Sequence, residues 1–488
     1  MGKTKIAFHT FGCKLNFAET SAIARKFTED QYTIVDFKDK ADIYVIHSCT
    51  VTSQAEKKCK AAIRQSTKRN PDASVAVIGC YSQLKPEELL KMPGVNIVLG
   101  NSEKFKLFEV INSNNDPHPA SDFQITNTKS SIDTAISIGE DDLPENAFEN
   151  ALDSLSSEIG SSLYTAGQGA ELLDENTTNQ RPIKNYLRSK VYEPGYSLND
   201  RTRSFFKVQD GCDYFCTYCA IPFARGRSRS ATISETMKVA QQIASTDIRE
   251  IVLTGVNIGD FGRQHNESFL DLVKELDNLT GIDRIRISSI EPELLKDEII
   301  ELVSKSNRLM HHFHIPLQSG TDRILELMRR KYKREVFEAR VSKIKQLMPH
   351  ACIAADVITG FPGETEEDFE DTVNFIKRLD ISYLHVFTYS SRPGTKSASM
   401  GGQISEKEKA RRSKILHELS EHKKHKFYSD NQDTEQEVLW ESDVDNGHMF
   451  GFTGNYIRCK RPYSSDMVNA IEKVKLRQID QDEVFLVD

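Results

Sequence analysis

The chain has 488 residues, of which 38% are hydrophobic and 28% are charged, and its formal net charge is -8. On a prior of roughly 150 residues per domain this length predicts about three domains, which excludes a peptide, a toxin or a single binding module. No apolar run approaches the ~20 residues that span a membrane, so an integral membrane protein is excluded as well.

The nine cysteines are too few and too irregularly spaced for a disulfide framework in a chain of this length. In a reducing compartment, clustered thiols indicate metal binding instead. Because the N-terminal sequence runs straight into a strand-like segment without the apolar core of a signal peptide, we expect a cytoplasmic protein.

Residues 1–112 alternate short apolar strands with polar-faced helices. Strands are predicted at 6–10, 43–47 and 75–79, and helices at 16–29 and 53–68. This alternation is typical of an α/β domain whose doubly wound parallel sheet carries helices on both faces. Functional residues of such a sheet lie at the carboxyl ends of its strands.

Residues 113–200 form an insert rich in Ser, Asn, Asp, Glu and Gly, which we interpret as a linker. Within it, residues 130–180 contain 11 acidic residues and no Lys or Arg. Four apolar side chains between Phe148 and Ile159 recur at helical spacing and predict one amphipathic helix.

Residues 201–431 repeat a strand and a helix six times. The strands are predicted at 205–208, 251–253, 285–287, 313–315, 353–358 and 384–387. Six such units indicate a partial (β/α)6 barrel, with active-site residues directly after the strands. A charged helix at 405–430 precedes residues 432–488, where short strands at 438–440, 456–458 and 484–486 predict a small antiparallel barrel.

Cys212, Cys216 and Cys219 follow the first barrel strand with the spacing C-x3-C-x2-C. Zinc would require four ligands, whereas three thiolates leave one iron of a 4Fe-4S cluster open to the amino and carboxylate groups of S-adenosylmethionine. A zinc site completed by a distant histidine is the less favoured alternative. The motif resembles the radical S-adenosylmethionine superfamily, which implies cleavage of that cofactor to a radical that abstracts an unactivated hydrogen.

The later strand ends supply candidate contacts to S-adenosylmethionine, because glycines and polar residues there let the backbone approach a cofactor. The candidates are Tyr218, Thr254, Gly255, Asn257, Glu291, Gln318, Ser319, Asp356 and Gly360. Each alone is as well explained by a strand-to-helix turn; their positions at successive strand ends favour a cofactor.

Cys13, Cys49 and Cys80 each follow a predicted strand of the first domain. Since parallel strand ends meet at one edge, the three thiols are predicted to hold a second, auxiliary 4Fe-4S cluster. Three buried apolar thiols are the alternative. The remaining cysteines, at 59, 352 and 459, lack such contexts and are interpreted as structural.

The two cysteine triplets, in this order and followed by a small barrel, resemble the methylthiotransferases over almost the whole chain outside residues 113–200. The resemblance implies that the auxiliary cluster carries or delivers sulfur, taken from sulfide or polysulfide, and that a second S-adenosylmethionine donates the methyl group. It further implies a flavodoxin- or ferredoxin-type electron donor and is compatible with a sulfur-delivery partner.

A loop with three arginines, Arg225, Arg227 and Arg229, follows Cys219, and arginine binds phosphates and stacks on bases. The C-terminal segment adds Tyr456, Arg458 and Lys460 and is similar to the TRAM-type RNA-binding barrel of this family. A solvated basic loop and a purely structural barrel are the alternatives.

The arginine loop and residues 253–259 resemble the branch that acts on N6-threonylcarbamoyladenosine in the anticodon stem-loop of tRNA. Action on isopentenyladenosine, action on an aspartate of a ribosomal protein, and a noncatalytic iron-sulfur protein that binds RNA or senses redox state remain alternatives.

A disordered linker is the plain interpretation of the acidic block. A sharper hypothesis is that it competes with tRNA, in which case deleting 130–180 tightens binding; unchanged affinity at low salt would reject it.

Overall fold

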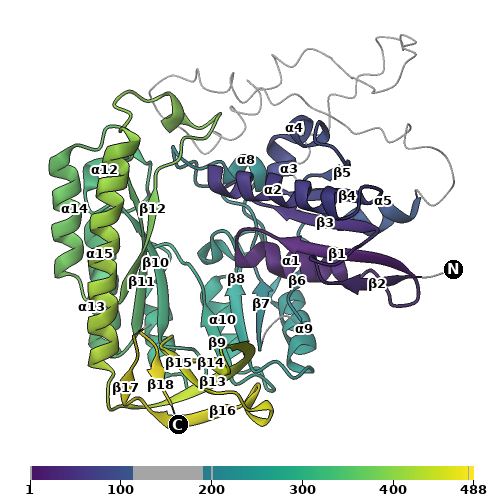
Figure 1. Ribbon diagram of the computed structural model, residues 1–488. Helices are drawn as coiled ribbons and strands as arrows, with labels where there is room; N and C mark the ends of the chain where they lie inside the picture. The colour runs from purple at the N-terminus through teal and green to yellow at the C-terminus, as the bar shows by residue number, and fades with distance from the viewer. Residues whose placement is uncertain (1–2, 114–190, 199–201, 482, 488) are drawn as a thin grey trace. The chain divides into compact units, whose positions relative to one another are not determined.

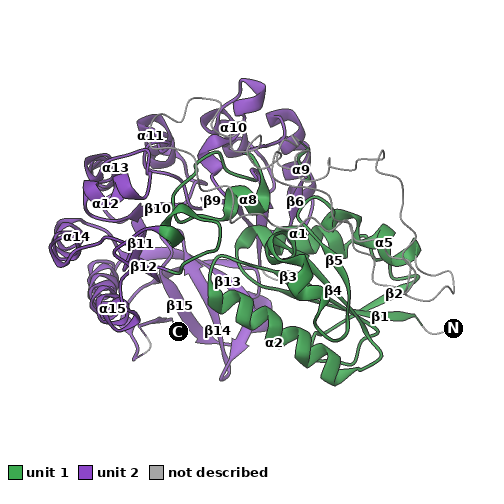
Figure 2. Ribbon diagram, turned by 90° about the horizontal axis from the view of Figure 1, so that it is seen from above, with its two compact units in different colours: residues 1–193, 211–227, 390–399 green, residues 194–210, 228–389, 400–488 purple. Residues whose placement is uncertain are grey.

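The computed structural model describes residues 3–113, 191–198, 202–481 and 483–487, and it divides into two compact units (Figures 1 and 2). Unit 1 contains the described residues of 1–193 together with 211–227 and 390–399, and unit 2 contains those of 194–210, 228–389 and 400–488. The acidic block and the helix predicted between Phe148 and Ile159 lie outside the described residues. The boundaries at 112, 200 and 431 stay predictions.

Unit 1 is built on a parallel sheet whose strand order is β2-β1-β3-β4-β5. Its strands are β1 (Thr4–Thr10), β2 (Tyr32–Val35), β3 (Ile43–Ser48), β4 (Ser74–Gly79) and β5 (Val95–Leu99). This is the flavodoxin-like doubly wound order: β2 is added on one side of β1 and the later strands on the other, which places the switch point of the strand order between β1 and β3. The predicted parallel sheet is confirmed, and β2 and β5 are added to it.

Helices cover both faces of this sheet. They are α1 (Lys14–Ala24), α2 (Ser53–Arg69), α3 (Cys80–Leu84), α4 (Pro86–Leu90) and α5 (Leu107–Ser113), with the short η1 (Lys104–Lys106) before α5. Apolar residues of α1 and α5 pack with Ile6, Val45 and Ala76 on one face. Those of α2 and α4 pack with the alternate residues Ala7 and Tyr44 on the other face.

The sequence sets the start of α2 locally. The side chain of Thr52 accepts a hydrogen bond from the amide of Ala55, and Glu56 lies in the first turn. Lys68 and Arg69 in the last turn suit the negative end of the helix dipole.

The same unit also contains α8 (Ile221–Arg225), which follows the C-x3-C-x2-C segment.

Unit 2 contains six parallel strands arranged as a partial barrel. They are β7 (Arg203–Lys207), β8 (Glu250–Thr254), β9 (Arg284–Ile287), β10 (His312–Gln318), β11 (Cys352–Thr359) and β12 (Tyr383–Thr388). A parallel bridge between Ser289, in the loop after β9, and His314 of β10 links the two groups of strands. The two-residue β6 (Gly195–Tyr196) pairs antiparallel with β7. The six predicted strand–helix repeats are therefore confirmed.

The barrel helices pack their apolar faces against the strands in one core. They are α9 (Ile233–Ala244), α10 (Phe269–Asp277), α11 (Asp297–Lys305), α13 (Arg334–Leu347) and α14 (Glu366–Arg378), followed by α15 (Glu406–Asp430); the short α12 (Asp322–Leu327) follows β10 and lies outside this core. Short turns η3 (Ile258–Asp260), η4 (Arg263–His265) and η5 (Lys396–Ser399) lie in the loops. Among these described helices, as among the others, none is long and apolar enough to cross a membrane.

The C-terminal residues form a curled, mostly antiparallel sheet, as expected for a small barrel. Its elements are β13 (Glu435–Asp445), β14 (His448–Thr453), β15 (Arg458–Pro462), η6 (Ser465–Met467), β16 (Ile471–Lys475), β17 (Gln478–Ile479) and β18 (Phe485–Leu486). The strand expected at 456–458 is largely a turn, in which Tyr456 has a φ of 68°. The turn residue ends the β14 segment and reverses the chain into β15.

The C-terminal sheet is bonded to the amino-terminal ends of the barrel strands. Arg286 forms a buried ion pair with Glu250, and its Nη1 donates to the carbonyl of Gly454 at 3.0 Å. Arg284 donates to the carbonyl of Phe452 at 3.0 Å. These contacts occupy the end of unit 2 that lies opposite the carboxyl ends of the strands, and it is at the carboxyl ends that parallel barrels place their active-site residues.

Candidate functional site

The auxiliary cysteines lie at three adjacent strand ends of unit 1. Cys13 follows β1 and is the N-cap of α1, Cys49 follows β3, and Cys80 follows β4 as the first residue of α3. Because the strand order places β1, β3 and β4 side by side, the predicted convergence of the thiols on one rim follows from the sheet itself.

Close packing around Gly12 shows how near these loops approach one another. Gly12 has a φ of 98°, and a Cβ added to it would lie 2.8 Å from both Cβ and Sγ of Cys49. A side chain at position 12 would therefore displace the Cys49 thiol. Burial raises the pKa of Cys49 to about 12, and the neighbouring thiols of Cys80 and Cys13 add to this effect. Assembly of a cluster must consequently release protons.

Hydrogen-bond donors aimed at sulfur fit the chemistry of cluster ligands. Nδ2 of Asn101 lies 3.5 Å from Sγ of Cys80 in unit 1. In the C-x3-C-x2-C segment of the same unit, the amide of Tyr214 donates to Sγ of Cys212 at 3.3 Å. N–H groups directed at thiolate sulfurs stabilise the negative charge on sulfur and tune the reduction potential of an iron-sulfur cluster. Within the described residues, the three thiols of neither triplet all lie within 4.8 Å of one another.

Backbone contacts fold the C-x3-C-x2-C segment into a tight loop. The amide of Cys212 donates to the carbonyl of Gly226 at 3.0 Å, and that of Cys219 donates to the carbonyl of Cys216 at 3.0 Å. Gly211 has a φ of 70°, and a Cβ there would lie 1.9 Å from the carbonyl oxygen of Arg227. The loop therefore requires glycine directly before its first cysteine.

In unit 2 the residues predicted to contact S-adenosylmethionine lie at the carboxyl ends of successive strands. Thr254 ends β8, Gln318 ends β10, Asp356 lies within β11 and Gly360 follows it. The others lie in the loops after β8, β9 and β10, at Gly255, Asn257, Glu291 and Ser319. Tyr218, in contrast, belongs to unit 1 and is partly buried.

Gln209 organises the loop after β8, a role that the sequence did not reveal. Its Oε1 accepts from the amides of Val256 and Asn257 at 2.9 and 2.8 Å. Its Nε2 donates to Oγ of Ser228 at 2.9 Å. Gln209 lies one residue before the point at which the chain leaves unit 2 for the cysteine loop. The glutamine thus fixes the backbone of the loop after β8 and ties it to Ser228 within unit 2.

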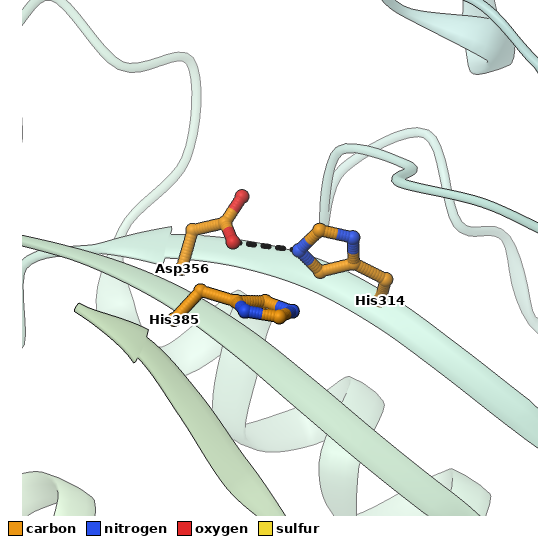
Figure 3. A group of neighbouring side chains, drawn as sticks. All are labelled: His314, Asp356 and His385. Carbon is orange, nitrogen blue, oxygen red and sulfur yellow. Dashed lines mark hydrogen bonds and ion pairs between the residues drawn. The ribbon is translucent and has the colours of Figure 1, made fainter. Parts of the chain in front are cut away.

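His314, Asp356 and His385 form a polar group on β10, β11 and β12 (Figure 3). Nε2 of His314 lies 2.6 Å from Oδ1 of Asp356, and the rings of the two histidines meet edge to face with centroids 5.0 Å apart. The neighbouring strand residues Ile315, Ala355 and Leu384 pack in the helix-facing core. By strand alternation the polar group therefore faces the interior of the partial barrel. The sequence had singled out only Asp356 of the three.

Glu291 adjoins this group in an acidic environment. It forms an ion pair with Arg330. Burial raises the pKa of Glu291 to about 7; Arg330 opposes the shift, and Glu293 and Asp356 add to it. A carboxyl group poised near neutrality inside a barrel rim is typical of a functional site.

This pKa predicts a pH dependence of stability. Between the ordinary glutamate value and about pH 7, the folded protein binds a proton at Glu291 that the unfolded chain releases, so the free energy of unfolding falls as pH rises through this window. We expect Glu291→Gln to remove the decrease in the free energy of unfolding that Glu291 causes over this pH window, which is at most about 3 kcal/mol. Denaturant unfolding of both proteins between about pH 5 and pH 8 measures it; parallel curves would contradict it.

The three arginines of the predicted RNA-binding loop have different environments. Arg225 and Arg229 are buried in ion pairs with Glu19 and Asp210 respectively. Arg227 is partly buried. The first two thus hold the loop in place within their own units, and contact of the three arginines with RNA stays a prediction.

The three predicted RNA contacts of the C-terminal sheet also differ in their surroundings: two are engaged within the sheet and one is exposed. The ring of Tyr456 stacks on Phe452 with centroids 4.8 Å apart and lies against Arg286, so it is packed within unit 2. Lys460 is ion-paired with Asp480. Arg458 is exposed and its guanidinium lies 4.1 Å from the centroid of the Phe450 ring. This last pair is a cationic and aromatic surface of the kind that binds nucleic acids.

The partial barrel and the cysteine loop define the class of protein, and comparison with known families agrees. Residues 206–376 match the radical SAM superfamily, and residues 5–100 match a family described as uncharacterized protein family UPF0004. Among solved structures, the radical S-adenosylmethionine methyltransferase TsrM from Kitasatospora setae shares the fold, with a TM-score of 0.50 and 14% identity over 81% of this chain and 74% of that one. The chain is thus a radical S-adenosylmethionine enzyme.

Curated relatives narrow the class. The threonylcarbamoyladenosine tRNA methylthiotransferase MtaB of Bacillus subtilis is 37% identical, with 96% of this chain and 93% of the relative covered. The MtaB of Aquifex aeolicus is 34% identical over 94% and 96%. A tRNA-2-methylthio-N(6)-dimethylallyladenosine synthase of Akkermansia muciniphila is 29% identical over 84% and 82%. The chain belongs to the radical S-adenosylmethionine methylthiotransferase family, in its MtaB-like branch.

Proposed function

We propose that this enzyme converts N6-threonylcarbamoyladenosine beside the anticodon of tRNA to its 2-methylthio derivative. The observation that carries the proposal is the match to relatives named threonylcarbamoyladenosine tRNA methylthiotransferases along 89–98% of the chain at 30–37% identity. Relatives named dimethylallyladenosine synthases cover 84–86% at 28–31% identity. The substrate base is assigned on this difference.

The placement of the cysteines supports the chemistry. Both triplets belong to unit 1, with the first at adjacent strand ends and the second in the loop that ends at α8. With the cofactors bound, a cluster on Cys212, Cys216 and Cys219 and S-adenosylmethionine would supply the radical that breaks the C2–H bond, and a cluster on the other triplet would supply the sulfur. A second S-adenosylmethionine provides the methyl group, so C2–H becomes C2–S–CH3.

The described residues of unit 2 would bind and orient the cofactor and the base. The loop held by Gln209 and the ends of β10 and β11 offer backbone groups, and His314, Asp356 and Glu291 offer charged and polar groups inside the barrel. These groups replace water around the reacting atoms and fix their orientation. Arg458 on the C-terminal sheet is the proposed contact to the tRNA backbone.

We further propose a flavodoxin- or ferredoxin-type protein as electron donor and sulfide or polysulfide as sulfur source. Radical cleavage of S-adenosylmethionine requires one electron. The sulfur of S-adenosylmethionine stays in methionine after this cleavage, so the sulfur of the new C–S bond must come from another source. A sulfur-delivery protein is compatible with this scheme. Purified enzyme supplied with reduced flavodoxin and sulfide tests both assignments, since omission of either component should stop product formation.

Nucleoside mass spectrometry tests the substrate. The chain is expressed in anaerobic cells that lack their own methylthiotransferases, and tRNA nucleosides are compared before and after expression. We expect threonylcarbamoyladenosine to gain one methylthio group in place of a hydrogen. A gain on isopentenyladenosine would retain the chemistry but overturn the base assignment, and a gain confined to a ribosomal protein would overturn the tRNA assignment.

A further inference from the structure

We propose that Arg225 is a positioning residue of the auxiliary cluster, which ties the loop of the radical cluster to the auxiliary rim and raises the reduction potential of a cluster held by Cys13, Cys49 and Cys80. The proposal rests on the proposed function in so far as that function assigns this triplet a cluster. Arg225 lies six residues after Cys219 in the chain, yet its side chain bonds to Asn16 and Glu19 on α1, the helix whose N-cap is Cys13.

Arg225 is the last residue of α8 and is 1% exposed. Its guanidinium donates from Nη1 to Oε1 of Glu19 at 3.2 Å and from Nη2 to Oε2 of Glu19 at 3.1 Å. Nη2 also donates to Oδ1 of Asn16 at 2.6 Å. A planar guanidinium matches a carboxylate in this two-pronged manner and fixes the orientation of both groups. The contact joins residues 206 positions apart.

Asn16 carries the connection to the first two auxiliary cysteines. Its Oδ1 lies 3.8 Å from Sγ of Cys13. Its Nδ2 donates to the carbonyl of Ser48, which directly precedes Cys49, at 3.3 Å, and to the carbonyl of Phe11 at 2.8 Å. One asparagine thus holds two cysteine loops and accepts a hydrogen bond from Arg225.

Asn101 makes the corresponding connection to the third cysteine. Its Nδ2 lies 2.7 Å from the carbonyl of Ala224, the residue before Arg225, and 3.5 Å from Sγ of Cys80. Its Oδ1 accepts from Nζ of Lys104 at 2.7 Å, and the same Nζ donates to Oε2 of Glu19 at 2.6 Å. All three auxiliary cysteine loops are therefore bonded, through Asn16 or Asn101, to the end of α8.

The charge of Arg225 is the second part of the proposal. Glu19, Arg225 and Lys104 are each at most 1% exposed, so solvent screens their charges weakly. Nη2 of Arg225 lies 2.6 Å from Oδ1 of Asn16, and this oxygen lies 3.8 Å from Sγ of Cys13, so the cation lies close to one of the three thiols. Reduction adds an electron to a cluster bound by three thiolates, and a nearby cation stabilises that added charge.

The test uses the full chain carrying Cys212→Ala, Cys216→Ala and Cys219→Ala, so that only the auxiliary cluster can assemble. After anaerobic reconstitution, iron content and the midpoint potential are measured by redox titration with electron paramagnetic resonance detection. Adding Arg225→Met should weaken the affinity of this cluster for an electron about tenfold, equivalent to about 59 mV for one electron. Arg225 lies in the loop of the radical cluster, and the triple-alanine variant does not contain that cluster. A change in potential therefore reports on the auxiliary cluster.

Companion variants separate charge from fold. Lys104→Met should also lower the potential, Glu19→Gln should raise it, and Arg225→Lys should restore most of the parent value. Arg286→Met is the matched control, because Arg286 is an equally buried guanidinium paired with Glu250 in unit 2 and should leave the potential unchanged.

Two results would overturn the role of Arg225 alone. One is an assembled cluster whose potential is the same in the parent and in both Arg225 variants. The other is a shift of the same sign in Arg225→Met and Glu19→Gln, which indicates general disruption of the rim. A parent that assembles no cluster overturns this inference together with the cluster assignment, whereas the identity of the tRNA base does not enter the measurement.

Discussion

Replacing Cys216 by alanine should reduce methylthiolated tRNA to the background level while leaving tRNA binding close to that of the unmodified enzyme. Cys216 is buried, and its carbonyl accepts the amide of Cys219, a backbone contact that alanine preserves. The substitution therefore removes one thiolate and keeps this backbone contact. Two remaining thiolates cannot hold a cluster that needs three protein ligands and one open iron.

The measurement combines nucleoside mass spectrometry, iron content and tRNA binding on the same preparations. Iron should fall by about one cluster per chain while the auxiliary cluster remains. Cys352→Ala is the matched control, because Cys352 is also buried but lies on β11 in the apolar core beneath the C-terminal sheet. Full activity of the Cys216 variant would show that this loop is structural, and equal loss of tRNA binding would favour a noncatalytic RNA-binding protein.

The positions of the auxiliary cysteines were predictable because strand alternation is a local signal. Apolar segments ending near 10, 47 and 79, each followed by a cysteine, predict a parallel sheet with three thiols at one edge. The structure places β1, β3 and β4 next to one another, so no long-range information was needed. The glycines that precede Cys13 and Cys80 have positive φ values, which the sequence shows only as Gly residues.

The role of Arg225 was not predictable, because its partner Glu19 is 206 positions away and sequence spacing does not report such contacts. An arginine-rich loop has the same composition whether it binds phosphate or a buried carboxylate. Tyr456 shows the same limit: its positive φ and its packing against Phe452 depend on the turn before β15. A signal for His314 and His385 was present, since both alternate with apolar residues that pack in the core.

Replacing Cys49 by alanine should separate radical formation from sulfur insertion. Cys49 lies at the end of β3 and belongs to the auxiliary triplet, whereas the loop of Cys212, Cys216 and Cys219 is held by its own contacts to Gly226 and Tyr214. We expect the variant to release 5′-deoxyadenosine from S-adenosylmethionine at a rate within about threefold of the unmodified enzyme. Methylthiolated tRNA should be undetectable, because the rim loses a ligand of the sulfur-bearing group.

The two products are quantified in one anaerobic reaction, which makes the ratio of 5′-deoxyadenosine to methylthiolated nucleoside the decisive quantity. Cys59→Ala is the matched control: Cys59 is a fully buried thiol on α2 outside both triplets, and its loss should leave the ratio unchanged. If Cys49→Ala stops 5′-deoxyadenosine formation as well, the auxiliary rim must support the radical loop. The bonds from Asn16 and Asn101 to the end of α8 would then be the route by which damage at one triplet reaches the other.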